Sequence, residues 1–402
     1  MKTLTKNFFL AIATAALFSA FIYFEYFGIS NKLINTLCGL GAIALMLYIP
    51  KRAVLIAGFF IGLFWFYWIG YSFKYQGVGY MQPFVTFGFG VVYLLFFAPL
   101  AFTDKPWIRA FLLFGLSFLE PLGWNWMKIE LLFVNSYIGV YIYQFIALLL
   151  ALSLPSLIKK KKYKFLPLLL LIFAINYGYP KQYDAPLKIK LVETNIPQNV
   201  KWTRAAIYPT VAMIFQEIHK AQKEGYDVIV FPESVFPLFM NEEPTLIQEL
   251  EKDSQKITII AGTLLYQNNL NYNVTYMFQN GKYKIAKKLV LVPFGEYIPL
   301  PKFAKKFIND TFFQGESDFV TAKKPTDFDI KGIKFRNAIC YEATCKELYK
   351  DNFKYMIAIS NNAWFTPSIE PTLQKLLIEY YARKHGVTVY HAANIAGTGV
   401  IK

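Results

Sequence analysis

Three short stretches of the sequence carry, at or near a predicted strand end, a side chain suited to nucleophilic chemistry. A carboxylate follows an apolar run at Glu233, an ammonium lies at Lys288, and a thiol ends the run Asn337–Cys340. A thiol of ordinary pKa is only a few per cent thiolate at neutral pH, so it needs a neighbouring base to remove its proton during attack. Glu, Lys and Cys, in that order along the chain, are therefore a candidate base, cation and nucleophile.

The cysteine content favours a reactive thiol over a disulfide framework. The sequence has three cysteines, Cys38, Cys340 and Cys345, and such an odd, sparse count is not typical of a disulfide-stapled protein. A Cys340–Cys345 bridge in an oxidising compartment is the alternative. A strand-end residue and one five positions on seldom present facing Cβ atoms at bridging distance. The three histidines are too scattered to argue for a metal site, and no metal is expected.

The composition indicates a membrane protein. Of 402 residues, 55% are apolar and 18% aromatic, which exceeds what a water-soluble protein usually carries. Residues 1–182 are nearly continuous apolar runs and are predicted to form a transmembrane helical domain, whereas residues 183–402 mix strands, charged helices and turns as a globular domain does. The net charge of +16 comes with lysine clusters beside apolar runs, which favours a membrane surface over nucleic acid.

About seven spans are predicted, and the charges between them suggest an orientation. The spans cover residues 7–23, 32–48, 53–73, 84–102, 107–122, 136–158 and 165–179, of which the fifth and seventh are the weakest. Eleven Lys and Arg residues fall in one set of alternate connections and three in the other, which places the N-terminus in the cytoplasm. Seven crossings would deliver the remainder to the outer, periplasmic face of the inner membrane. The loss of either weak span would reverse that placement.

From Leu187 onward the pattern becomes that of an α/β domain. Strands are predicted over 188–193, 227–232, 257–261, 272–279, 282–286, 333–340, 355–360 and 387–393, and helices over 204–224, 244–253, 343–350 and 369–384. Asn280-Gly281 between two strands is a strong hairpin signal, because both positions tolerate positive φ. Strands alternating with helices, with a hairpin among them, predict a mixed sheet with helices on its face.

Five ordered motifs in this half resemble one enzyme family. They are Asn195-Ile196-Pro197-Gln198 with Lys201-Trp202, Phe231-Pro232-Glu233-Ser234, Leu291-Val292-Pro293-Phe294-Gly295-Glu296-Tyr297, Ile339-Cys340-Tyr341-Glu342 and Ile359-Ser360-Asn361-Asn362-Ala363-Trp364-Phe365. Together they resemble the nitrilase (carbon-nitrogen hydrolase) superfamily and, within it, the apolipoprotein N-acyltransferases of the bacterial inner membrane. The resemblance implies that residues 183–402 are a nitrilase-like catalytic domain, an αββα sandwich with a Glu, Lys, Cys triad.

The resemblance also implies the role of each site residue. Cys340 would attack an ester carbonyl, Glu233 would take its proton, and Lys288, which the family's spacing of eight residues before Glu296 selects over Lys287, would stabilise the oxyanion. Supporting roles would fall to a set of substrate-binding or orienting residues, Trp202, Glu296, Tyr341 and Glu342. The reference pKa values of a carboxylic acid and a thiol are roughly 4 and 8.5, so burial or a nearby cation must narrow that gap.

A basic, partly apolar segment follows the third of these motifs. Phe303 and Phe307 stand four residues apart among lysines, which is the pattern of a helix lying on a lipid surface. We predict a lid over 300–325 through which lipid reaches Cys340, and the alternative is a surface helix packed on its own domain. The family continues into further strands and a last transmembrane helix, whereas this sequence ends at Lys402.

The predicted reaction is a two-step acyl transfer. A phospholipid would donate an acyl chain to Cys340, and the α-amine of a diacylglyceryl-modified apolipoprotein would accept it, without a cofactor, because the thioester keeps the acyl group activated. A monomer is expected. One alternative is a membrane-tethered nitrilase-type amidase with water as acceptor, and another is a catalytically silent membrane scaffold.

Overall fold

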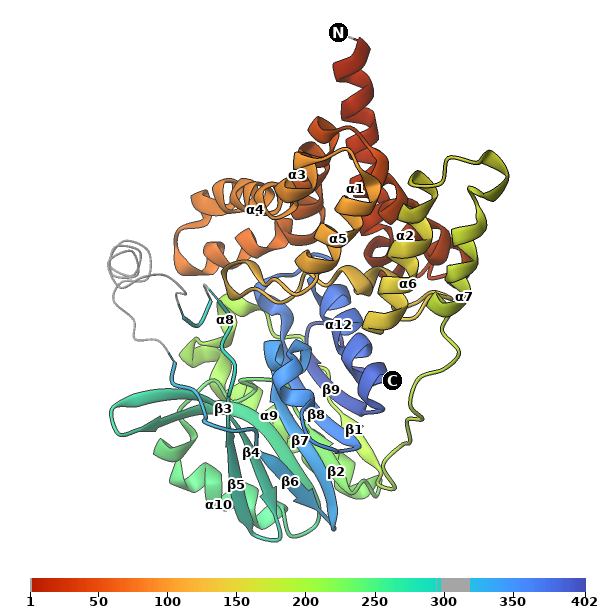
Figure 1. Ribbon diagram of the computed structural model, residues 1–402. Coiled ribbons are helices and arrows are strands. Elements are labelled where there is room, and N and C mark those ends of the chain that lie inside the picture. Colours follow the sequence, from red (N-terminus) through yellow and green to blue (C-terminus); the bar gives the residue numbers. More distant parts are fainter. Residues whose placement is uncertain (1, 294, 298–318) are drawn as a thin grey trace. The chain divides into compact units, whose positions relative to one another are not determined.

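The computed structural model describes residues 2–293, 295–297 and 319–402, and they form two compact units (Figure 1). One unit comprises Met1–Tyr179 with Pro367–Tyr380, and the other comprises Pro180–Thr366 with Tyr381–Lys402. The predicted lid falls largely on residues outside the described ranges. The domain boundary at residue 182 remains a prediction.

The first unit is helical. Its α-helices are α1 (Lys2–Tyr26), α2 (Lys32–Tyr48), α3 (Lys51–Phe66), α4 (Gln82–Phe97), α5 (Pro106–Leu116), α6 (Ile142–Ser153), α7 (Leu171–Ala174) and, as far as Tyr380, α12 (Glu370–His385). 3-10 segments extend α3 and α4. In the described part of the chain three helical stretches are long and apolar enough to cross a membrane, Leu4–Tyr26, Lys51–Gln76 and Gly79–Phe102, and α2 and Ile142–Ser156 are shorter apolar helices. The count of seven spans stays a prediction.

Small residues bring α3 and α4 together. A Cβ added at Gly62 would lie 2.6 Å from the carbonyl oxygen of Phe89 and 2.9 Å from Cβ of Tyr93, and one at Gly58 would lie 2.9 Å from the carbonyl oxygen of Tyr93. Two glycines four positions apart let helix backbones approach closely in a membrane. The spacing was readable from the sequence.

A buried arginine binds backbone carbonyl groups at the ends of neighbouring elements. Arg109, in the first turn of α5, is 1% exposed and donates hydrogen bonds to the carbonyl oxygens of Leu47 and Ile49, at 3.1 and 2.5 Å, and of Leu100 and Thr103, at 2.9 and 2.8 Å. A helix end leaves carbonyl groups without intrahelical partners, and a guanidinium satisfies several at once. Arg109 therefore joins the end of α2 to the chain before α5.

The second unit is a sandwich of two five-stranded mixed sheets. The first has the order β1-β2-β3-β4-β5 and contains β1 (Ile189–Leu191), β2 (Val228–Val230), β3 (Thr258–Gln267), β4 (Leu270–Gln279) and β5 (Lys282–Lys287). The second has the order β10-β9-β8-β7-β6 and contains β6 (Asp327–Ile330), β7 (Ile333–Ile339), β8 (Tyr355–Asn361), β9 (Thr388–Asn394) and β10 (Gly399–Ile401). Within each sheet parallel and antiparallel pairs coexist.

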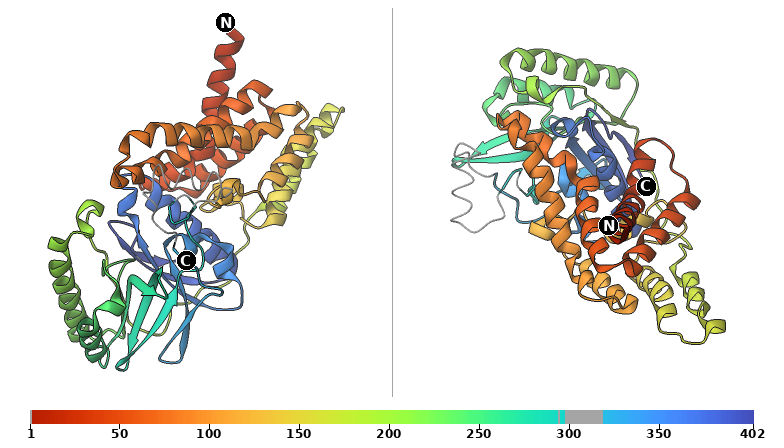
Figure 2. Two further views of the ribbon diagram at one scale, coloured as in Figure 1. Left: turned by 90° about the vertical axis from the view of Figure 1, so that its left-hand side faces the viewer. Right: turned by 90° about the horizontal axis from the view of Figure 1, so that it is seen from above.

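Strand alternation divides the residues between two cores. Val228, Val230 and Ile260 pack between the sheets against Ile339 and Ile357. Their neighbours in the strands, such as Ile229 and Ile259, point the other way and pack against the helices α9 (Arg204–Lys223) and α10 (Pro244–Asp253), which cover that sheet (Figure 2). Successive side chains of a strand face opposite sides, so a strand covered on both faces is apolar throughout.

The predicted elements largely match those observed. The turn at Asn280-Gly281 joins β4 to β5 with φ values of 53° and 71°, which confirms the hairpin. The helix predicted over 343–350 is wrong, because the chain there forms two short 3-10 segments, η10 (Cys340–Thr344) and η11 (Lys346–Tyr349). α12 (Glu370–His385) matches the last predicted helix, whereas β6, β10 and the β3 extension beyond Ala261 were missed.

We expect Gly62→Leu to lower the free energy of unfolding by about 1–3 kcal/mol, the usual penalty of overpacking, since the new side chain has no space against α4. Thermal unfolding of the detergent-solubilised protein measures the effect. Gly88→Leu is the matched control, because a Cβ at Gly88 meets nothing within 4 Å. Equal loss in both variants would contradict the close packing of α3 on α4.

Candidate active site

Cys340 lies at a strained turn. It follows the last residue of β7, opens η10 and has a φ of 55°, in the left-handed region that residues with a side chain rarely adopt. Such strain costs on the order of 1–3 kcal/mol and is found mostly at functional sites. The turn leaves Cys340 half-buried at the end of the strand. None of the three cysteines, all of them within the described residues, forms a disulfide.

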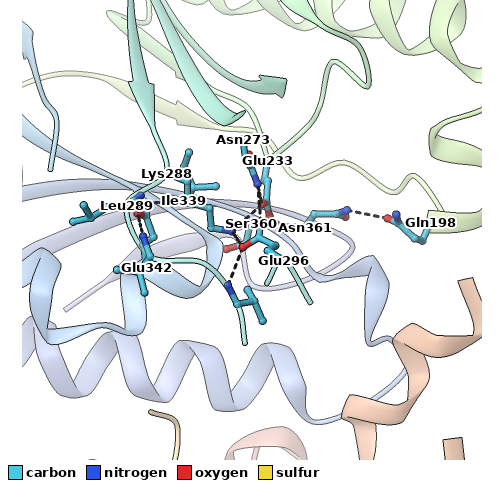
Figure 3. Close-up of polar contacts among 12 residues, drawn as sticks. Gln198, Glu233, Asn273, Lys288, Leu289, Glu296, Ile339, Glu342, Ser360 and Asn361 are labelled. Carbon is cyan, nitrogen blue, oxygen red and sulfur yellow. Dashed lines mark hydrogen bonds and ion pairs between the residues drawn. The ribbon is translucent and has the colours of Figure 1, made fainter. Parts of the chain in front are cut away.

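Glu233 lies in a similar turn after β2. Its carboxylate accepts hydrogen bonds from the Asn273 side-chain amide at 2.8 Å and from the backbone N–H of Asn361 at 2.9 Å (Figure 3). Ser234, the next residue, has a φ of 48°. A Cβ at Gly262 on β3 would lie 2.6 Å from Cα of Glu233, so only glycine lets this turn pack against the neighbouring strand. Both carboxylate oxygens of Glu233 are thus held.

Lys288 is a buried ammonium between two carboxylates. It directly follows β5 and is 1% exposed. Its Nζ lies 2.8 Å from the Glu296 carboxylate and 3.6 Å from Glu233 Oε1. Burial lowers the pKa of Lys288, but Glu296, Glu233 and the nearby Cys340 together outweigh it, so that its pKa lies above the ordinary value. Lys288 therefore keeps its positive charge at neutral pH.

The Glu342 carboxylate accepts hydrogen bonds from backbone N–H groups and, among the described contacts, forms neither a hydrogen bond nor an ion pair with Lys288. One oxygen accepts from the N–H groups of Leu289 and Val290, and the other accepts from the N–H of Ile339 at 2.7 Å. These bonds tie the segment after Lys288 to the residue before Cys340 (Figure 3). Burial raises the pKa of Glu342 to about 7, against the opposing effects of Lys288 and of the three N–H donors.

The other two predicted supporting residues differ in exposure. Tyr341 is 3% exposed and belongs to the core of the unit, whereas Trp202 is 43% exposed.

Of the predicted site residues, the structure brings Glu233, Lys288 and Glu296 into direct contact. Cys340 lies near enough for its charge to raise the pKa of Lys288. Among the described residues no group of three or more His, Cys, Asp and Glu side chains is arranged to hold a metal ion.

Two family models together match nearly the whole chain. "Apolipoprotein N-acyltransferase integral membrane domain" matches residues 4–177, and "Carbon-nitrogen hydrolase" matches residues 189–400. Proteins named apolipoprotein N-acyltransferase are 42% identical to it in Wolinella succinogenes (98% of this chain, 96% of the relative), 38% in Helicobacter hepaticus (92% and 94%) and 35% in Helicobacter pylori (93% and 88%).

The chain belongs to the apolipoprotein N-acyltransferase family. The resemblance inferred from the five motifs is therefore confirmed, as is the fold class of a helical membrane domain followed by a carbon-nitrogen hydrolase sandwich. This acyltransferase is a bacterial membrane protein with lipid and lipoprotein substrates.

Sequence reasoning on this acyltransferase missed a group of buried amides. Asn273 donates to Glu233 and, at 3.2 Å, to Glu296, so it bridges the two carboxylates. The Asn361 side chain donates to Gln198 Oε1 at 2.9 Å and accepts from Asn394 Nδ2 at 2.8 Å. A signal was available, because Gln198 and Asn361 lie in the quoted motifs and Asn273 interrupts an apolar strand.

Glu296→Gln and Glu342→Gln test the two kinds of contact. Glu296→Gln removes the negative charge beside Lys288, so we expect about a hundredfold slower acyl transfer, the size seen when an oxyanion-stabilising group is impaired, and about 3–5 kcal/mol of lost stability, because Lys288 loses one of its buried carboxylate partners. Glu342→Gln leaves a backbone N–H without an acceptor, so we expect about 1–3 kcal/mol of lost stability as well as lost activity. Product formation and thermal unfolding are the measurements. Unchanged stability in Glu342→Gln would contradict the assigned backbone role.

Proposed function

We propose that this acyltransferase moves a fatty acyl chain from a phospholipid to the N-terminal amine of a diacylglyceryl-modified apolipoprotein through a thioester on Cys340. The observation that carries the proposal is the buried Lys288 between Glu233 and Glu296, in a protein whose family acts on lipoproteins. Glu233 is the general base and Lys288 the oxyanion-stabilising cation. Glu296 and Glu342 support them by holding Lys288 and the backbone beside it, and Tyr341 and Trp202 are assigned to the substrate pocket.

In the first half-reaction Cys340 Sγ attacks the ester carbonyl carbon while Glu233 takes the thiol proton. The resulting oxyanion is stabilised by the Lys288 ammonium. When the intermediate collapses, the bond between the acyl carbon and the glycerol oxygen breaks. Glu233 returns its proton to that oxygen, and a lysophospholipid leaves.

In the second half-reaction the α-amine of the apolipoprotein attacks the thioester carbonyl. Glu233 takes a proton from the amine, the carbon–sulfur bond breaks, and the proton passes to the sulfur of Cys340. Because the first product leaves before the acceptor reacts, the kinetics are ping-pong. The acyltransferase-type membrane domain at residues 4–177 favours this reaction over a tethered amidase or a silent scaffold.

Cys340→Ala is expected to abolish triacylated product and to leave the diacylated apolipoprotein unmodified. Mass spectrometry of a lipoprotein N-terminus, in cells that depend on this enzyme for N-acylation, provides the measurement. Cys38→Ala on α2 is the matched control and should retain activity, because it lies in the helical unit. Diacylated lipoprotein from the wild type, or hydrolysed lipid without acyl transfer, would argue against the proposal.

We also propose that the sandwich faces the periplasm and that the protein acts in the inner membrane as a monomer. The excess of Lys and Arg on one side of the predicted spans supports this orientation. Asn269→Cys places a thiol at the exposed β3–β4 turn. In a Cys38→Ala background we expect a membrane-impermeant maleimide to label it in spheroplasts. Labelling only after membrane disruption would indicate a cytoplasmic sandwich.

A further inference from the structure

A second lysine of the sandwich unit is buried beside the site. Lys201 ends the short helix α8 (Gln198–Lys201) and is 2% exposed. Lysine is almost never fully buried unless it is paired. In the described part of the chain its ammonium has one hydrogen bond, 3.0 Å to the backbone carbonyl oxygen of Glu233, and no carboxylate within ion-pair distance. A cation in this position is costly, and packing alone does not require it.

The charges around the site explain what such a cation would do. Glu233 and Glu296 place two carboxylates around one ammonium, Lys288. When Glu233 takes the thiol proton, the negative charge moves from the Glu233 carboxylate to the sulfur of Cys340. The charges of Glu233 and Cys340 both act on Lys201, which shows that Lys201 lies within electrostatic reach of each. Two further titratable groups among the described residues interact with these charges. Glu342 interacts with Lys288, and His391 on β9 has a pKa that burial lowers and the charge of Glu233 raises.

We propose that Lys201 is a positioning residue that fixes the turn carrying Glu233 and supplies the second positive charge that stabilises negative charge at Cys340. This inference rests on the proposed role of Cys340 as nucleophile. Lys288 offsets one of the two carboxylate charges, and Lys201 stabilises the second negative charge as it moves from Glu233 to Cys340. The motif context of Lys201, next to Trp202, gave no indication of this role.

The two lysines differ in how they respond to pH. Burial, opposed by Glu233 and Cys340, lowers the pKa of Lys201 to about 8, whereas the pKa of Lys288 is raised. Lys201 is therefore mostly charged at pH 7 and loses its charge as the pH rises through about 8, while Lys288 stays charged. The contribution of Lys201 should be present below pH 8 and fade above it. A purely structural role would not follow this titration.

The test measures the first half-reaction alone, which avoids the titration of the acceptor amine. Full-length protein in detergent micelles is mixed with phospholipid, and acylated Cys340 is quantified over time by mass spectrometry from pH 6.5 to pH 10. Lys201→Met removes the charge, and Lys201→Gln removes it but keeps an N–H donor. Lys190→Met is the matched control, because Lys190 lies on β1 of the same unit and pairs with Glu217 and Glu224.

At pH 7 we expect both Lys201 variants to acylate at least about tenfold more slowly, since an opposite charge nearby typically shifts ionisation by a pKa unit or more. For Lys201→Gln, which keeps an N–H donor, the ratio of wild-type to variant rates should fall toward one by pH 10. For Lys201→Met, which also loses the bond to the Glu233 carbonyl oxygen, the ratio should fall but stay above one, and Lys190→Met should match the wild type. A ratio that stays constant with pH, no loss of rate, or the failure of both variants to fold would overturn the proposal. Absence of acylated Cys340 in the wild type would instead overturn the proposed function.

Discussion

The structure of the site depends on a buried ammonium held between carboxylates. Removing Lys288 from water is costly, and the cost is offset only if Glu296 and Glu233 stay in place. Fixed donors hold both carboxylates, since Asn273 bridges them and the N–H of Asn361 binds Glu233. Loss of one partner would leave an uncompensated charge in the interior. This constraint explains why so many buried polar groups surround a small reactive centre.

The sandwich meets this constraint through the ends of its strands. β2 belongs to one sheet and β7 to the other, and a shared apolar core packs the sheets face to face. Glu233 and Cys340 each follow one of these strands, and at each turn a non-glycine residue takes a positive φ, Ser234 in one case and Cys340 in the other. A tight turn of this kind places a reactive side chain directly after the end of a strand and needs no long loop. The apolar core thus determines where the reactive groups lie.

Strand ends and the hairpin were predictable because they depend on local signals. Apolar runs ending on Glu233 and Cys340, and Asn280-Gly281, are visible in the sequence and match the structure. The helix expected over 343–350 failed, because Glu342 directs its carboxylate to backbone N–H groups and the chain turns in 3-10 segments. Asn273, Asn361 and Lys201 were missed for a related reason. Their roles depend on partners that are distant in sequence, 40, 128 and 32 positions away.

The charged groups and the neutral amides of the site have different roles. A cation hydrogen-bonded directly to the Glu233 carboxylate in place of Asn273 would stabilise the carboxylate form. It would therefore oppose the proton transfers that both half-reactions require. Neutral donors fix its orientation at a smaller electrostatic cost. The amides of Gln198, Asn361 and Asn394 extend this fixed frame through the interior, at 2.9 and 2.8 Å between successive groups. Neutral amide and N–H groups therefore fix the orientation of Glu233. The few charged groups, Lys288 and Lys201, are left to stabilise the negative charge that moves during the reaction.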